Sequence, residues 1–222
     1  MGGETTAPRR LDPEATRAQI LAVARRVFAE RGFAGTSMSL LARETGVTQS
    51  LIHHHFGSKR ELWNHLKEVY AQEYLEHGGP VEMERDDPVA AWAERQFSFL
   101  RANPELVRLI AWAHLDSDGE LPERMRTLSA SVEEMFRTAQ SDGRIRGDVD
   151  PAHAQLLISQ CISGWLQSKP LFCSLSGRDP DDPAVDADYL QDLIAVFSAG
   201  LAPEAEQTQR DHRQRTPRHR AG

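Results

Sequence analysis

Residues 36–62 read TSMSLLARETGVTQSLIHHHFGSKREL and contain the strongest structural signals of the chain. Within it, Gly46 separates two short segments with apolar faces, at a point where a turn needs a permissive backbone. Thr48 is a favourable N-cap, because its hydroxyl can accept from a backbone N–H of the following turn. Ser58 and Lys59 then begin a further helix, whose N-terminal N–H groups suit an anion such as phosphate. The stretch therefore predicts two helices joined by a tight turn, followed by a third.

The second of these helices has two different faces. At about 100° per residue, Ile52 and Phe56 lie on one side, flanked by Leu51 and His55. The opposite side is polar and carries Gln49, Ser50, His53 and His54. A helix of this size fits the major groove of B-DNA, where amide and hydroxyl groups hydrogen-bond base edges or phosphates. The alternative is a helical hairpin inside an ordinary all-α core.

Residues 19–66 resemble the DNA-binding domain of the TetR family of bacterial transcriptional regulators. The matching positions are Ile20, Ala24, Phe28, Gly32, Phe33, Thr36, Ser37, Leu41, Ala42, Gly46, Val47, Thr48, Ile52, His55, Phe56, Lys59 and Leu62. The resemblance implies an all-α fold: an N-terminal three-helix helix-turn-helix DNA-binding domain, then a helical C-terminal ligand-binding and dimerisation domain. The sequence departs from the family at His53, where the family usually has a Tyr that reaches a backbone phosphate.

The resemblance also implies roles for the polar residues. Base contacts are expected near Gln49 and Ser50, and phosphate contacts from the three histidines and Lys59. The full predicted DNA-binding set is Thr36, Ser37, Thr48, Gln49, Ser50, His53, His54, His55 and Lys59. A nearby phosphate favours imidazolium, so DNA binding is expected to strengthen as the pH falls toward about 6. Consecutive helical residues point about 100° apart, so the three histidines do not converge on an ion, and no metal site is predicted.

The charge distribution supports a DNA-binding N-terminal part. The net charge is −7, but residues 1–67 hold 10 Lys and Arg against 6 Asp and Glu. Residues 68–202 hold 11 against 24, and residues 203–222 hold 5 against 3. The attractive field therefore lies where phosphate is expected, and the acidic body discourages DNA from binding elsewhere.

Composition and motifs restrict the remaining possibilities. The 222 residues permit one to two domains with a substantial core. No apolar run approaches the roughly 20 residues that span a bilayer, and the N-terminus lacks the apolar segment of a signal peptide. Two cysteines suggest no disulfide framework, so a reducing cytoplasm is expected. There is no catalytic triad order, metal-ligand spacing or phosphate-binding glycine loop, so we expect neither an enzyme nor a cofactor.

Helical periodicity and start signals predict the domain organisation. The predicted domains are a flexible arm (1–11), a DNA-binding domain with a connecting helix (12–79), an effector-binding and dimerisation domain (80–202) and a disordered tail (203–222). Asp12-Pro13 and Asp150-Pro151 are helix starts, with Asp as N-cap and Pro at the first helical position. The body is predicted as helices throughout, with a polar loop at about residues 174–186.

In the resembled family the body binds a small effector and dimerises through its last two long helices. The candidate effector-binding residues are Trp92, Trp112, His114, Met125, Phe136 and Trp165. The alternative for these large apolar side chains is that they simply fill the core. We therefore predict a homodimeric repressor that an unidentified effector releases from a double-stranded DNA operator, with its recognition helices in major grooves about 34–36 Å apart. A transcriptional activator of the same fold, and a helical protein-interaction adaptor without DNA binding, remain alternatives.

Overall fold

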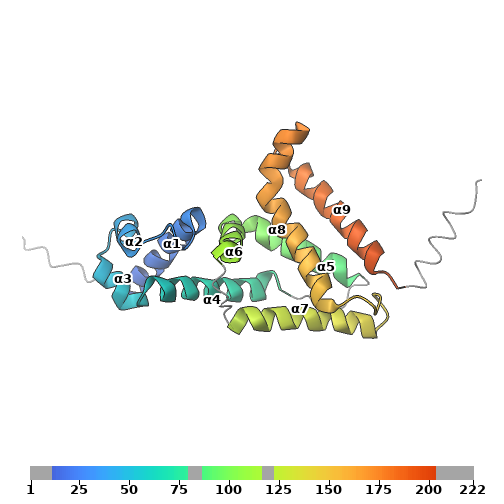
Figure 1. Cartoon of the computed structure of the whole chain (residues 1–222), viewed down its shortest axis with the longest axis horizontal. Helices are drawn as coiled ribbons and strands as arrows, with labels where there is room; N and C mark the ends of the chain where they lie inside the picture. The colour runs from blue at the N-terminus through green and yellow to red at the C-terminus, as the bar shows by residue number, and fades with distance from the viewer. Residues whose placement is uncertain (1–11, 80–86, 117–122, 204–222) are drawn as a thin grey trace, which may run out of the picture. The chain divides into compact units, whose positions relative to one another are not determined.

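A computed structural model describes residues 12–79, 87–116 and 123–203, which form nine α-helices and no strand (Figure 1). In chain order the helices are α1 (Pro13–Arg31), α2 (Met38–Thr45), α3 (Gln49–Phe56), α4 (Lys59–His77), α5 (Pro88–Ala102), α6 (Pro104–Asp116), α7 (Glu123–Ser141), α8 (Pro151–Ser176) and α9 (Pro183–Leu201). The predicted all-α fold is confirmed. The predicted arm at residues 1–11 and the predicted tail after Pro203 lie outside the described residues.

Asp-Pro pairs begin four of these helices. The N-cap residues of α1, α5, α8 and α9 are Asp12, Asp87, Asp150 and Asp182, each followed by Pro. Each aspartate accepts a hydrogen bond from a first-turn backbone N–H at 2.8–3.0 Å. Proline has a fixed φ and no backbone N–H, and it follows the N-cap at a position where an N–H would have no partner within the helix.

The last two helices differ from the expectation. Helix α8 continues to Ser176 with Pro170 inside it, and Gly177 ends it in the left-handed conformation. Helix α9 begins at Pro183, within the residues expected to form a loop. The Asp and Pro residues that suggested a loop also form the Asp182-Pro183 start signal, so the connection is short.

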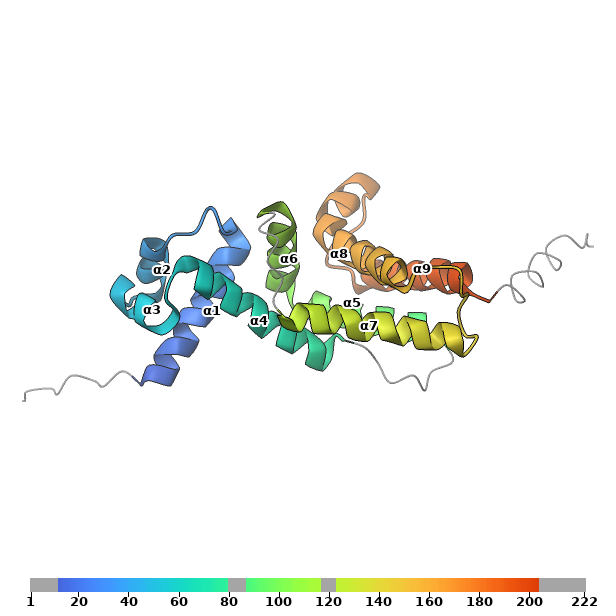
Figure 2. The ribbon, with the colours of Figure 1, turned by 60° about the horizontal axis from the view of Figure 1, so that its bottom comes forward.

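The described residues divide into two compact units, residues 12–67 with 108–116, and residues 68–79 and 87–107 with 123–203. The core of the first unit is built on Ile20, Phe28, Leu41, Ile52 and Leu62, each with no exposed surface. In the second unit α5 packs against α8 and α9, and α7 packs against α8 (Figure 2). Its largest fully buried side chains are Trp92, Leu100, Phe136, Ile158 and Ile162. The predicted domain boundary after residue 79 falls at the edge of a segment outside the described residues.

Candidate nucleic-acid interface

Helices α2 and α3 are joined by a three-residue turn with the predicted chemistry. Gly46 has φ 73° and ψ 12°, a left-handed conformation that glycine adopts without steric cost. The Thr48 hydroxyl accepts a hydrogen bond from the Leu51 N–H at 3.2 Å and so caps α3. Ser37 caps α2 in the same way, accepting from the Leu40 N–H at 3.1 Å. Two capped helices around one glycine turn fix the orientation of α3.

Helix α3 has one buried and one exposed face. Ile52 is fully buried and Phe56 is 8% exposed. The polar side chains on the other face are exposed: Gln49, Ser50, His53 and His54. His55 is half-buried and contacts the Phe56 ring, with centroids 6.2 Å apart. The helix therefore packs through its apolar side and presents two histidines, an amide and a hydroxyl outward.

The His53 ring makes two side-chain contacts that define its donor and acceptor atoms. Its Nδ1 lies 2.7 Å from the Gly57 carbonyl oxygen, which can only accept, so Nδ1 carries a proton. Its Nε2 lies 3.4 Å from the Gln49 amide nitrogen. In the neutral ring Nε2 therefore accepts from Gln49 and offers no N–H to a phosphate. Only a ring protonated on both nitrogens could donate there.

Lys59 and Thr36 hold the loop between α1 and α2. The Lys59 ammonium donates to the carbonyls of Phe33 and Thr36, both at 2.9 Å, and lies 4.1 Å from the Phe33 ring centroid. The Thr36 side chain is buried and donates to the Gly32 carbonyl at 2.8 Å. Both side chains thus have structural partners, and their predicted DNA contacts stay predictions.

The start of α4 is capped by its own carboxylate, which the sequence reading did not anticipate. Glu61 accepts from the Ser58 backbone N–H at 2.6 Å, and the Ser58 hydroxyl accepts from the Glu61 N–H at 3.2 Å. This reciprocal pair is a capping box. The backbone hydrogen bond from Ser58 lowers the pKa of Glu61. A phosphate approaching this helix end therefore meets a carboxylate as well as the helix dipole.

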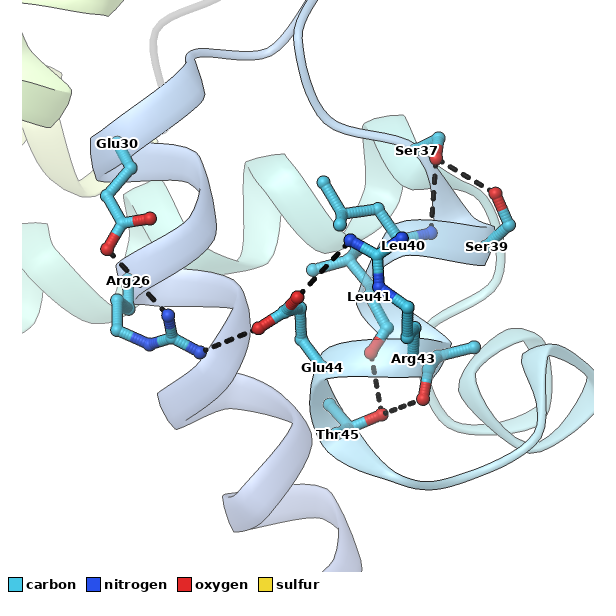
Figure 3. Close-up of polar contacts among 10 residues, drawn as sticks. Arg26, Glu30, Ser37, Ser39, Leu40, Leu41, Arg43, Glu44 and Thr45 are labelled. Atoms are coloured by element: carbon cyan, nitrogen blue, oxygen red, sulfur yellow. Dashed lines mark hydrogen bonds and ion pairs between the residues drawn. The ribbon is translucent and has the colours of Figure 1, made fainter.

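One ion pair joins α2 to α1, and two others lie within these helices (Figure 3). Arg26 of α1 lies 3.3 Å from Glu44 of α2 and 3.7 Å from Glu30 of its own helix. Arg43 lies 3.4 Å from the same Glu44 carboxylate. Hydrogen bonds from Arg26 and then Arg43 lower the pKa of Glu44. Thr45, one residue later, donates to the Leu41 carbonyl of its own helix at 2.7 Å. Gln19 of α1 donates to the Thr45 carbonyl at 2.8 Å, which is a second contact between the end of α2 and α1.

The candidate effector-binding residues do not form one cluster. Trp92 and Phe136 meet edge to face, with ring centroids 5.4 Å apart. Trp165 instead donates to the buried Asp186 carboxylate at 3.0 Å. Trp112 belongs to the first unit, where its indole N–H donates to the Ala29 carbonyl at 3.2 Å.

The remaining two candidates differ in exposure. His114 is exposed on α6, and Met125 is half-buried on α7. Sequence reasoning missed three buried polar residues of the second unit, Gln96, Ser163 and Asp186. Gln96 lies four residues after Trp92, which is the signal that could have placed it beside that tryptophan. Asp186 stands in an acidic stretch that resembles a solvated loop, and it offered no such signal.

Two kinds of feature are absent from residues 12–79, 87–116 and 123–203. No group of three or more His, Cys, Asp or Glu side chains there could hold a metal ion. None of the helices in these ranges is long and apolar enough to cross a membrane.

Comparisons with known proteins match both halves of the chain. A model described as "Bacterial regulatory proteins, tetR family" matches residues 20–66, and one described as "Tetracyclin repressor-like, C-terminal domain" matches residues 88–189. The chain is 32% identical over 161 residues to the HTH-type transcriptional repressor SCO4008 of Streptomyces coelicolor, covering 69% of this chain and 79% of that relative. It is 25% identical over 206 residues to the HTH-type transcriptional repressor NicS of Pseudomonas putida, covering 88% and 97%. The crystal structure of the transcriptional regulator SCO4942 from Streptomyces coelicolor shares the fold, with a TM-score of 0.68 and 24% identity over 82% and 97% of the two chains.

Proposed function

The chain belongs to the TetR family of bacterial regulatory proteins, and from this membership we propose that it is a homodimeric repressor that a small effector releases from its operator. That it is a DNA-binding transcriptional regulator follows from the two matched family models and the named repressors. Regulators of this family are generally not enzymes. Its place of action is then the bacterial cytoplasm, where an operator is accessible.

The observation that carries the DNA-binding mode is the exposed polar face of α3. Gln49 and Ser50 are exposed in the first turn, where side chains of a recognition helix meet base edges. His53 and His54 follow on the same exposed face, and imidazole groups placed there could contact phosphates of the DNA backbone. We therefore assign base reading to Gln49 and Ser50, and phosphate positioning to the histidines.

Dimerisation is supported by an exposed apolar stripe on α8. Residues at alternating spacings of four and three share this side of the helix: Leu157, Cys161, Gly164, Ser168, Leu171 and Leu175. Its leucines Leu157, Leu171 and Leu175 are 55%, 64% and 81% exposed. Such spacing matches the seam of packed helical bundles, and leucines this exposed favour burial against a second copy. A two-fold dimer would carry two α3 helices and so read two half-sites.

Selection of bound duplexes from a random pool tests the operator proposal. The full chain is expected to enrich a motif with two-fold symmetry and to bind it with a steep inverse dependence on salt. Light scattering should give twice the chain mass of 24.9 kDa. Leu171→Glu should yield the single-chain mass, whereas Ser129→Glu on the exposed side of α7 should not. Failure to enrich any duplex, with no salt-dependent binding, would favour the protein-interaction adaptor.

A further inference from the structure

Two buried side chains of α5 each leave one polar atom without a partner. Trp92 is 1% exposed and Gln96 is 4% exposed. Neither the Trp92 Nε1 nor the Gln96 Oε1 has a hydrogen-bond partner among the described residues. The two residues are four apart on one helix, so they share a face of α5. Buried polar atoms in folded proteins are nearly always paired, so two on one face call for a partner that the described residues do not supply.

The other end of the Gln96 side chain is held by hydroxyl groups. Its amide nitrogen donates to the Ser159 hydroxyl of α8 at 3.0 Å. The same side chain hydrogen-bonds to Tyr74 of α4. Burial raises the pKa of Tyr74 far above its ordinary value, so this hydroxyl stays neutral. The amide nitrogen is therefore used within the chain, while the amide oxygen has no partner among the described residues.

The Trp92 indole offers the complementary donor in an apolar setting. Its ring meets the fully buried Phe136 of α7 edge to face. The indole nitrogen has one N–H and no acceptor capacity, so only an acceptor can satisfy it. Trp92 and Gln96 together therefore present one donor and one acceptor on a single helix face, with aromatic surface beside them.

We propose that the effector is an uncharged molecule with an apolar body and a group that both accepts and donates hydrogen bonds, such as a primary carboxamide, and that it binds between Trp92 and Gln96. The acceptor of this group pairs with the Trp92 N–H, and its donor pairs with the Gln96 oxygen. The assignment rests on the proposed effector-released repressor and names the chemistry of its ligand.

The electrostatics of this region favour an uncharged ligand. Trp92, Gln96 and Ser159 are uncharged, and Tyr74 is held neutral. Arg95 is the neighbouring cation on α5, and its guanidinium donates to the Glu76 carbonyl at 2.9 Å. The Arg95 Nε is buried without a partner among the described residues, so a ligand cation would meet a like charge and lose its hydration. A carboxylate has only acceptors and would leave the Gln96 oxygen unpaired. A carboxamide would lose little, because both its polar ends are paired.

Binding between these residues requires movement of helices. Trp92 and Gln96 are almost completely covered in this conformation, so a ligand of aromatic size has to displace α5 or the helices packed on it. A ligand that binds only the displaced arrangement shifts the protein toward that arrangement. This preference is what release from an operator requires.

The test uses the full chain with ¹⁵N in its four tryptophan indoles. The four N–H signals are assigned by single Trp→Phe substitutions and followed by NMR during titration with four similar probes: benzamide, toluene, benzoate and benzylamine. Benzamide should move the Trp92 signal and leave that of Trp63 in place, while the other three probes leave the Trp92 signal unchanged. Gln96→Met should weaken benzamide binding about tenfold. Gln160→Met, at an exposed position of α8, should not.

Three results would overturn the assignment. The first is no movement of the Trp92 signal with benzamide, which is expected if the two atoms bind only water. The second is equal movement with toluene or benzoate. The third is benzamide binding that leaves the affinity for the operator duplex unchanged. The titration uses no DNA, so its failure is separate from a failure of the duplex selection. A chain that selects an operator but ignores benzamide retains its regulator function and loses this ligand class.

Discussion

The helix-turn-helix framework (α1 to α3 and the start of α4) and the core around Trp92 and Gln96 of α5 both contain buried polar side chains. They differ in whether those side chains have hydrogen-bond partners. In the framework, Thr36, Thr45 and Lys59 donate to backbone carbonyls at 2.7–2.9 Å. Around α5, Trp92 and Gln96 each leave a polar atom without a partner among the described residues. These three framework donors are thus satisfied within the chain, while Trp92 and Gln96 retain unused hydrogen-bonding capacity.

The difference matches two roles: the framework keeps α3 in one orientation, and the α5 core is proposed to bind a ligand. A recognition helix has to arrive at the groove with its side chains already oriented, so internal hydrogen bonds that fix the turn are favourable. A ligand site instead keeps groups that only the ligand satisfies, and this costs stability in its absence. Substitutions in the two regions should therefore have opposite signatures in folding and in function.

The largest effect is expected at Gly32, the C-cap of α1. Its φ of 67° and ψ of −178° lie in a region that is essentially restricted to glycine. A Cβ there would also lie 2.7 Å from the Trp112 ring. Gly32→Ala should therefore cost roughly 3 kcal/mol or more in the free energy of unfolding. Urea denaturation measures this loss.

Gly46→Ala is the control for that substitution. Gly46 also has a positive φ, but no heavy atom lies within 4 Å of its Cβ position. The expected cost is about 1–2 kcal/mol, the strain of a left-handed residue alone. Equal losses at the two glycines would mean that neither the conformation of Gly32 nor its contact with Trp112 matters.

The next effect is a difference between two tryptophans of the second unit. Trp165 donates to the Asp186 carboxylate, which is also 3.0 Å from the Lys169 ammonium, whereas the Trp92 N–H has no partner among the described residues. Phe in place of either leaves a space of similar size, but only Trp165→Phe breaks a hydrogen bond to a buried charge. It should cost about 1–3 kcal/mol more than Trp92→Phe. A larger thermal destabilisation by Trp92→Phe would show that its N–H is satisfied after all.

A smaller effect is expected for Lys59→Met in the framework. The loss of two hydrogen bonds from an ammonium to part-buried carbonyls should lower stability by about 1–2 kcal/mol. If the third N–H also reaches a phosphate, as the sequence predicts, the slope of log K against log salt should fall by about one unit. Operator titrations between 50 and 200 mM salt, roughly the range over which such contacts weaken, measure the slope. An unchanged melting temperature would contradict the role of Lys59 in the framework. An unchanged salt slope would contradict its contact with phosphate.

Local signals made the framework predictable. The faces of α3 follow from helical periodicity, and Gly46 and Thr48 act through their immediate neighbours, so one sequence suffices to place them. The same holds for Asp12 and Asp150 as N-caps. Even here the Glu61 carboxylate was missed, although it stands three residues after Ser58 in the capping-box pattern.

The α5 core was predictable only in part, because its chemistry depends on non-local contacts. The sequence analysis placed Trp112 and Trp92 in one candidate site because both are large and apolar. Residue type does not specify which unit a side chain belongs to, and Trp112 packs on α1. Gln96 acquires its role from Ser159, 63 residues away, and from Tyr74. Its unpaired oxygen is a consequence of three helices packing together, which helical periodicity does not encode.

The smallest effect is expected at His53, on the exposed face where the framework meets DNA. A ring that already uses Nδ1 on the Gly57 carbonyl must gain a proton at Nε2 before it can donate to a phosphate, and this proton ends its role as acceptor for Gln49. Operator affinity should therefore rise a few-fold from pH 8 to pH 6 in matched salt, because phosphate favours the imidazolium. His53→Tyr, which carries a donor at both pH values, should reduce this dependence and keep the selected sequence unchanged. Equal wild-type affinities at the two pH values would argue against a phosphate contact by His53. A new base preference in the variant would show that residue 53 affects base recognition through Gln49.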